Sequence, residues 1–479
     1  MLSDNNSLKK FLEIPYDRLE EMNLEAKGKR DTVDSEKLEE EYRAYLKKEK
    51  LIKAVTLCFS DIEGRFHMLD YDKKYFLESA ENLTFDGSSI RGFTQQRESD
   101  LRLSVDWTSI VWLPSDIFGS GKVIFFANIK NRDRSQYESD FRGILQEYSK
   151  KLKNKDGLEA FASPEIEGFL LDGIDAEQNY DGKTGFKLIS MGGYYHSLPL
   201  DSLRVFIDAS AEAQRSMGFS NEKDHPEVAP SQFEMNFSYS QVLRACDQAQ
   251  LYKLVCRQVA NNMGMTASFL PKPIAGINGS GMHINISLAK NKKNIFYEKK
   301  GRDGLSSIAW DFLSKILNHA SEMCIIFNSS VNAYRRLDPH FEAPNQIKVS
   351  AVDRGAMIRI PVANEKSSRI EIRSVAPDAN PYLVLYVILR AGLEGKKLIM
   401  DKSKRPRVRI LPGTIYDAIK LCKSSEFIDK ILGQENKEKY LYFKEASADK
   451  SPKELGKKVK TSEIIFHHEI TDQILWNSF

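Results

Sequence analysis

The stretch Met282-His-Ile-Asn-Ile-Ser-Leu288 alternates apolar and polar residues without a break. In a β-strand, residues two apart share a face. His283, Asn285 and Ser287 therefore point one way, while the methionine, isoleucines and leucine point the other way. The alternation predicts a strand with one apolar face for a core and one face of polar side chains.

Three further stretches have the same period and place carboxylates on the polar face. They are Glu165-Ile-Glu167, Phe233-Glu-Met-Asn-Phe237 and Ile370-Glu-Ile-Arg373. A single such face would be an ordinary solvated sheet face. Clustered carboxylates, however, repel one another unless a cation neutralises them. Oxygen ligands suit Mg2+ or Mn2+, and one histidine is compatible with both. The candidate metal ligands are Glu165, Glu167, Glu227, Glu234, His283 and Glu371.

Composition excludes several other classes of protein. The chain has 479 residues, enough for more than one domain, and its net charge of +3 is small beside 70 basic and 67 acidic residues. We therefore expect neither a nucleic-acid nor a membrane partner. The five cysteines contain no CxxC pair and predict reduced thiols. With no signal-like segment, the expected location is the cytoplasm.

The chain divides into three parts by composition. Residues 1–50 are rich in charge, with apolar residues at helical spacing, and predict a helical arm. Residues 51–140 contain the strand candidates Ala54–Ser60 and Val123–Asn128, which predict a small mixed domain. Residues 141–479 alternate helices with the polar-faced strands. One long helix is predicted from its cap at Ser240 to Met263. The fold class is α+β.

Several blocks, in this order, resemble type I glutamine synthetase. They are Asp86-Gly-Ser-Ser89, Glu165-x-Glu167, Glu227-Val-Ala-Pro-Ser-Gln-Phe-Glu234, Asn278-Gly-Ser-Gly-Met-His283, Phe341-Glu-Ala-Pro344 and Arg369-Ile-Glu-Ile-Arg373. Each block is weak alone, but their order and spacing are specific. The resemblance implies a small N-terminal β-grasp-like domain. It also implies a large C-terminal catalytic domain with a curved antiparallel sheet flanked by helices.

The resemblance also implies a reaction, in which ATP drives the ligation of ammonia to L-glutamate through γ-glutamyl phosphate. Two or more Mg2+ or Mn2+ ions are expected per site. Glu167, Glu227 and Glu234 match the ligands of one ion, and Glu165, His283 and Glu371 match those of the other. No GxxxxGK[ST] loop occurs. The residues that match ATP contacts are Glu222, Asn285, Ser287, Arg354, Arg359, Lys366 and Arg369.

The other substrates have their own matching residues. Those for glutamate are Asn278, Gly279, Arg336, Glu342, Arg354 and Arg373. Those for ammonium are Asp86 and Ser89 from a neighbouring subunit, with Tyr194 and Glu227. The expected catalytic residues are Asp86, Glu342, Arg354 and Arg359. Glu342 would close a flap over the acyl phosphate, and the two arginines would face the transferring phosphoryl group. His196 and His225 match no site role, and we interpret them as structural or exposed.

Two alternative functions stay open at this stage. One is a γ-glutamyl ligase for a polyamine or another amine, and the other is a non-catalytic nitrogen-status sensor. The resemblance implies a dodecamer of two hexameric rings. Apolar residues within 466–479 fit a tail that clasps the opposite ring or one that packs on its own subunit. No tyrosine lies between Leu398 and Leu411, which predicts no adenylylation there.

Overall fold

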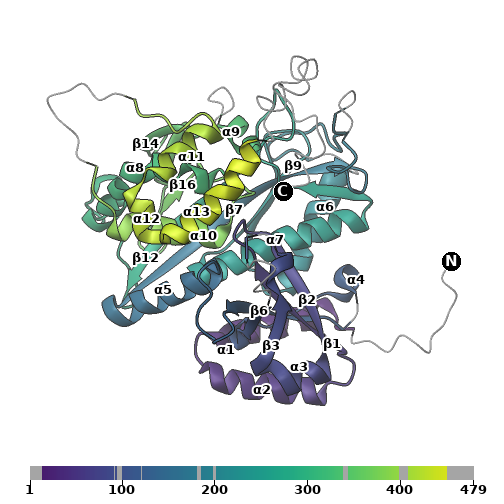
Figure 1. The fold of residues 1–479 in the computed structure, drawn as a ribbon. Coiled ribbons are helices and arrows are strands. Elements are labelled where there is room, and N and C mark those ends of the chain that lie inside the picture. The colour runs from purple at the N-terminus through teal and green to yellow at the C-terminus, as the bar shows by residue number, and fades with distance from the viewer. Residues whose placement is uncertain are drawn as a thin grey trace.

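The computed structural model describes residues 13–90, 92–93, 100–119, 121–180, 185–197, 201–337, 343–398 and 408–449. Figure 1 shows a small N-terminal domain and a larger domain that lies above it in this view. Glu342, residues 399–407 and the C-terminal residues 466–479 lie outside the described residues, as do the expectations placed on them.

The N-terminal arm consists of two helices, α1 (Tyr16–Arg30) and α2 (Ser35–Lys48). Leu38, Tyr42 and Leu46 recur at helical spacing, and all three are buried against the small sheet in one common core. The buried Asn23 side chain exchanges hydrogen bonds with the backbone of Trp112 and donates another to the carbonyl of Ser216. Because Ser216 belongs to the larger domain, the arm joins the two domains.

The small sheet has six strands within the described residues, in the order β2-β1-β6-β4-β3, with β5 paired to β6. The strands are β1 (Ala54–Ser60), β2 (Phe66–Asp72), β3 (Leu83–Asp86), β4 (Asp100–Val105), β5 (Val111–Trp112) and β6 (Val123–Lys130), with helices α3 (Lys73–Ser79) and α4 (Ser115–Phe118). The central strands β1 and β6 are parallel to each other. They are almost continuously apolar, which is typical of strands covered on both faces.

The large sheet has ten strands within the described residues, along the path β14-β15-β16-β12-β7-β9-β8. The strands are β7 (Leu158–Asp172), β8 (Asn221–Pro226), β9 (Gln232–Phe237), β10 (Ser240–Gln241), β11 (Met265–Ser268), β12 (Met282–Lys290), β13 (Lys293–Asn294), β14 (Gln346–Ser350), β15 (Ala356–Arg359) and β16 (Ile370–Ile372). Its pairings are antiparallel except for the parallel pair β14–β15. The predicted antiparallel sheet is thus confirmed, with one parallel pair at its edge.

Helices cover the apolar face of this sheet (Figure 1). Those that contact its strands are α5 (Phe141–Asp156), α6 (Ser202–Ser216), α7 (Val242–Asn262) and α8 (Ser307–Phe327). An outer group packs on these helices or on one another and consists of α10 (Pro381–Glu394), α11 (Ile415–Lys423), α12 (Glu426–Leu432) and α13 (Gln434–Ala448). The short helix α9 (Val331–Arg336) lies between α8 and β14 in the chain. Ile166, Phe233 and Ile284 are fully buried beneath the helices. The cap predicted at Ser240 is wrong, because Ser240 pairs with Ala162 in β10 and its hydroxyl donates to Gln248.

A buried ion cluster fixes the small domain to the large one. The Arg142 guanidinium lies 2.8 Å from the Asp106 carboxylate and 2.9 Å from that of Asp247, and it is only 1% exposed. Arg244 approaches the same two carboxylates, and the Tyr382 hydroxyl donates to Asp247. Removing one member would leave an uncompensated buried charge, so we expect the domains to move as one body.

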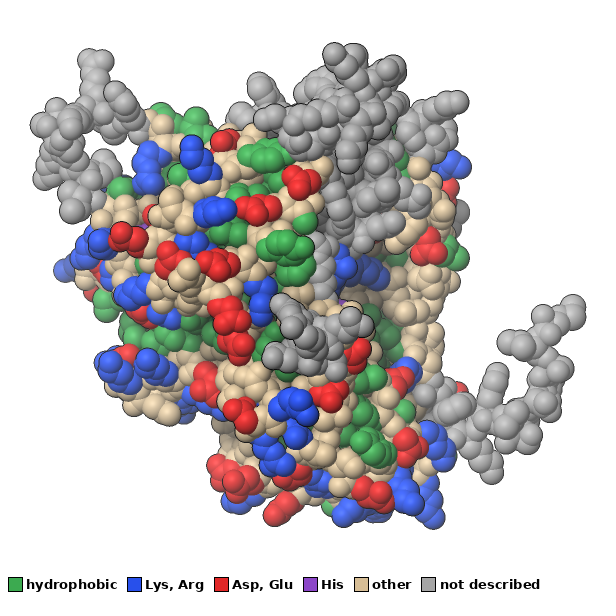
Figure 2. Space-filling view, viewed as in Figure 1, with side chains coloured by type: hydrophobic (Ala, Val, Ile, Leu, Met, Phe, Trp, Pro, Cys, Tyr) green, Lys and Arg blue, Asp and Glu red, His purple; other side chains and the backbone are tan. Residues whose placement is uncertain are grey.

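On the side that Figure 2 shows, lysines and arginines are mixed with aspartates and glutamates over the described residues, so no large patch of one charge is visible there. Among the described residues, no helix has the length and hydropathy needed to cross a membrane. All five cysteines are buried free thiols.

Candidate active site

Strand register brings five of the six predicted metal ligands to one face of the large sheet, and the sixth, Glu227, follows directly after β8. Glu165 on β7 lies directly opposite His283 on β12, and Glu167 lies opposite Glu234 on β9. Glu371 on β16 lies opposite Asn285 on β12, and Asn285 is two residues along that strand from His283. Because side chains alternate along each strand, these groups share the polar face while Ile166, Met235 and Ile372 enter the core.

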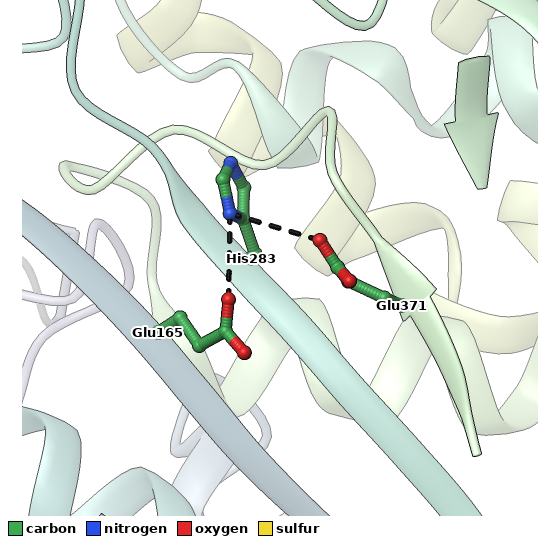
Figure 3. A group of neighbouring side chains, drawn as sticks. All are labelled: Glu165, His283 and Glu371. Atoms are coloured by element: carbon green, nitrogen blue, oxygen red, sulfur yellow. Dashed lines mark ion pairs between the residues drawn. The ribbon is translucent and has the colours of Figure 1, made fainter. Parts of the chain in front are cut away.

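One cluster consists of Glu165, His283 and Glu371 (Figure 3). The His283 Nδ1 lies 3.7 Å from Glu165 Oε2 and 3.9 Å from Glu371 Oε1, and all three candidate ligand atoms lie within 4.8 Å of one another. These separations exceed hydrogen-bond length. Three ligand groups that face one point without bonding each other are an arrangement suited to a divalent cation.

The second cluster contains a residue that sequence reasoning left out. His225, Glu227 and Glu234 offer ligand atoms within 4.8 Å of one another. His225 is buried, lies opposite Glu234 in the register of β8 and β9, and is 3.7 Å from Glu227. Glu167 lies between the clusters, since its Oε1 is 3.9 Å from His283 Nε2 and its Oε2 accepts a hydrogen bond from Gly281.

The electrostatics of this face favour a bound cation. Burial raises the pKa of Glu234 well above its usual range, and the charges of Glu165, Glu167 and Glu227 raise it further. Burial also raises the pKa of Glu227, and the charge of Glu167 raises it further. Burial opposes ionisation of Glu165 too, but the charge of the neighbouring His283 imidazole and a hydrogen bond from Asn285 lower its pKa to about 2. The pKa values of these neighbouring carboxyls are thus driven apart, as expected for repelling groups.

Arginines lie beside the carboxylates in the same cavity, which has a volume of about 290 Å³, and the Arg373 guanidinium is 3.3 Å from the Glu371 carboxylate. Its lining includes Asn278, Gly279, Arg336, Arg354, Arg359 and Arg373 together with Tyr194 and the six predicted metal ligands. The buried Arg336 donates to the carbonyls of Arg373 and Val375, at 2.9 and 3.3 Å. Burial lowers the pKa of Arg336 to about 10, although the negative charge of Glu167 acts to raise it. A second arginine, Arg359, donates to Glu371 over 2.6 Å.

Two glycines in this wall have no room for a side chain. A Cβ on Gly279 would lie 2.4 Å from the carbonyl oxygen of Pro271. A Cβ on Gly281 would lie 2.5 Å from an Arg336 nitrogen and 2.7 Å from His283 Nε2. Backbone therefore forms this part of the cavity, which lets a small ligand approach its polar groups directly.

The predicted nucleotide residues extend from the first cluster toward the protein surface. Asn285 donates to Glu165 over 2.8 Å and accepts from Arg369 over 2.8 Å, so it connects the metal-competent carboxylate to a guanidinium. Ser287 follows on the same face of β12. Glu222 and Lys366 are exposed. Of the predicted nucleotide residues, only Arg354 and Arg359 line the cavity itself.

Asp86 and Ser89 are separated from this cavity in the single chain. Both belong to the end of β3 and the turn after it, and neither is among the described residues that line the cavity. Asp86 is exposed and accepts hydrogen bonds from Ser88 and Ser89, which lower its pKa. On the cavity side, the Tyr194 hydroxyl donates to that of Tyr195 over 2.7 Å.

Fold and site together define a two-domain protein with two neighbouring acidic clusters on the polar face of its large sheet. Residues 51–132 match the family described as glutamine synthetase, beta-Grasp domain, and residues 138–459 match glutamine synthetase, catalytic domain. The chain belongs to the glutamine synthetase family. It is accordingly an enzyme of the glutamate–ammonia ligase class, as the motif resemblance predicted.

Individual relatives agree with this assignment. A glutamine synthetase of Thermotoga maritima is 35% identical over 435 residues, which cover 87% of this chain and 96% of that protein. One from Methanosarcina mazei is 36% identical over 421 residues, covering 84% and 92%. A cryo-EM structure of Plasmodium falciparum glutamine synthetase has a TM-score of 0.78 at 22% identity and covers 89% of this chain and 98% of that one, which supports the fold.

Proposed function

We propose that this enzyme makes L-glutamine, ADP and phosphate from L-glutamate, ammonia and ATP. The observation that carries the proposal is the single cavity in which two metal-competent clusters face Arg336 and Arg373. Carboxylates and guanidinium groups gathered in one cavity suit a reaction that joins an anionic amino acid to a nucleotide phosphate.

Glutamate binds by its α-carboxylate to Arg336 and Arg373 and by its α-amine at Asn278–Gly279. Arg336 is already held by two backbone carbonyls, so its guanidinium is oriented before the substrate arrives. Two Mg2+ or Mn2+ ions, when bound by the clusters, would neutralise the carboxylates and supply positive charge for the substrate anions. His225 joins the second cluster and offers it a nitrogen ligand.

The first chemical step transfers the γ-phosphoryl group of ATP. A γ-carboxylate oxygen of glutamate attacks the γ-phosphorus, ADP leaves, and γ-glutamyl phosphate forms. ATP is held along Glu222, Asn285, Ser287, Lys366 and Arg369, outside any P-loop. Arg354 and Arg359 stabilise charge that spreads over the transferring oxygens. Glu342, at the flap, shields the acyl phosphate from water.

The second step consumes ammonia. Ammonium binds between Tyr194 and Glu227 on one subunit and Asp86 and Ser89 on a neighbour, and a carboxylate takes its proton. Ammonia then attacks the acyl carbon, and phosphate leaves. The separation of Asp86 from its own cavity supports a site completed by a second copy. We propose the dodecamer of two hexameric rings as the assembly that supplies it.

The test is phosphate release and glutamine formation by the purified enzyme with glutamate, ATP and Mg2+, with and without ammonium. We expect glutamine only with ammonium, and loss of both products in Arg373→Ala. A matched control is Arg390→Ala, which removes an arginine paired with Glu394 away from the cavity. Consumption of methylamine or a polyamine without glutamine formation from ammonium would refute the proposal.

A further inference from the structure

His196 matches no site role in the sequence, but the structure places its ring between two hydrogen-bond acceptors. The Nδ1 lies 2.6 Å from the carbonyl oxygen of Gly193, and the Nε2 lies 3.0 Å from the Asp201 carboxylate. Both partners present oxygens that accept, so the two hydrogen bonds form together only when each ring nitrogen carries a hydrogen. The His196 side chain is 18% exposed and that of Asp201 is 5% exposed, which limits competition from water.

Asp201 is a firm anchor for this contact, because the same carboxylate caps a helix. One of its oxygens accepts from the amide of Leu203 over 2.8 Å at the start of α6. The other oxygen accepts from the Ser190 hydroxyl over 2.8 Å and faces His196. Burial acts to raise the pKa of Asp201, but the hydrogen bonds from Ser190 and His196 lower it below its usual value. The carboxylate is therefore ionised at neutral pH and remains an acceptor.

The Ser190, His196 and Asp201 side chains do not form a nucleophilic triad. In such a triad the serine and the carboxylate bind opposite nitrogens of the histidine. Here the Ser190 hydroxyl and His196 Nε2 approach the same oxygen of Asp201, and the hydroxyl is 3.5 Å from that nitrogen. The other ring nitrogen faces Gly193. The cluster therefore holds a loop in place and does not activate the serine.

The segment that His196 holds is a tight turn. The His196 amide also donates to the Gly193 carbonyl, over 3.0 Å. A Cβ on Gly192 would lie 1.7 Å from His196 Nε2, so the ring packs directly on the backbone there. Tyr195 has a φ of 57°, an uncommon conformation for a residue with a side chain, which the surrounding contacts must maintain. Its amide donates to the carbonyl of Pro226 over 3.3 Å.

This turn presents two tyrosines to the second metal-competent cluster. The rings of Tyr194 and Tyr195 stack with their centroids 3.8 Å apart. Both meet the His225 ring edge-on, with centroid distances of 5.7 Å for Tyr194 and 4.8 Å for Tyr195. Tyr194 lines the active-site cavity, as does Glu227. The position of the turn therefore sets where the Tyr194 hydroxyl lies within the cavity.

We propose that His196 is a positioning residue for the ammonium side of the active site. By joining Gly193 to Asp201, it fastens the turn that carries Tyr194 to the capped end of α6, a helix whose Phe206 is fully buried in the core. His196 itself is not among the described residues that line the cavity, so it acts through the turn. The inference rests on the proposed function, in which Tyr194 contributes to the ammonium site.

Two substitutions separate the two hydrogen bonds. In asparagine the amide nitrogen is as far along the side chain as Nδ1, and in glutamine it is as far as Nε2. His196→Asn therefore keeps a donor for Gly193, and His196→Gln keeps one for Asp201. Because the bond to a carboxylate is the stronger, we expect the KM for ammonium at fixed pH to rise about tenfold in His196→Asn and about threefold in His196→Gln. The KM for glutamate should stay within about twofold. Asp72→Asn is the matched control, because Asp72 caps α3 in the small domain, and neither KM should change.

Hydrogen exchange of the full-length enzyme, followed by mass spectrometry, gives a readout without turnover. We expect faster exchange of the amides of residues 188–197 in both variants, most of all in His196→Asn, and unchanged exchange over residues 205–216 of α6. Unchanged exchange over residues 188–197 would overturn the inference, whether or not the enzyme makes glutamine. A KM for glutamate that rises as much as that for ammonium would also overturn it, because the whole cavity would then be disturbed. A wild-type enzyme that makes no glutamine would refute the proposed function, while exchange would still decide whether His196 holds the turn.

Discussion

Replacing Glu234 by glutamine is expected to stabilise the metal-free enzyme while weakening its response to metal. Glu234 is 6% exposed, and a ligand oxygen of Glu227 lies within 4.8 Å of its own. Two unit charges held 4.8 Å apart repel by about 3.5 kcal/mol at an effective dielectric constant of about 20. A proton shared by the two carboxyls relieves part of this repulsion, which leaves about 1–3 kcal/mol for the substitution to recover.

The glutamine retains the geometry of the site. Asn236 donates to Glu234 over 2.6 Å, and the amide oxygen of a glutamine can accept that bond. We expect a higher melting temperature in the presence of a chelator. Added Mg2+ should raise the melting temperature of the wild type much more than that of the variant, because losing a metal ligand lowers the stabilisation that binding provides.

Thermal unfolding with and without a chelator checks both halves of this prediction. Glu212→Gln is the matched control, because Glu212 is an exposed carboxylate paired with Arg215 on α6. Its effect should stay within about 0.5 kcal/mol in either condition. A chelated Glu234→Gln enzyme that melts below the wild type would refute the reasoning, since Glu234 would then be a structural partner rather than a repelled ligand.

Three other predictions concern the same cavity. Arg336→Lys should raise the KM for glutamate about tenfold with little change in the KM for ATP, because a lysine cannot make both hydrogen bonds to the carbonyls of Arg373 and Val375. Steady-state kinetics with each substrate varied in turn checks this. Tyr195→Phe removes the hydroxyl that accepts from Tyr194, so the KM for ammonium should rise several-fold while that for glutamate stays constant; equal changes in both would contradict it. In chelator, stability should fall as pH rises above about 4.3, because the unfolded state loses the protons of Glu227 and Glu234 first. The lowered pKa of Glu165 instead gives stability that is lost as pH falls from about 4.3 toward 2, and melting curves from acid to neutral pH separate the two effects.

Local sequence patterns predicted which face of the sheet the side chains of the ligand strands occupy. The alternation in Met282–Leu288 and Glu165–Glu167 is set by the pleat, so the face of each side chain follows from its position alone. The strand predicted at Ala54–Ser60 has the same bounds in the structure. The cap at Ser240 failed because Ser240 and Gln241 form a short separate strand that pairs with β7, so the helix begins only at Val242.

By itself, the sequence determined the α+β class, the two-residue period of the ligand strands and the family motifs. Only the tertiary structure decided which strands lie side by side, because register depends on pairing between segments distant in the chain. That pairing placed His225 opposite Glu234 and His283 opposite Glu165. Burial and proximity, which set the pKa of a charged group and the need for a partner, exist only once the chain has folded.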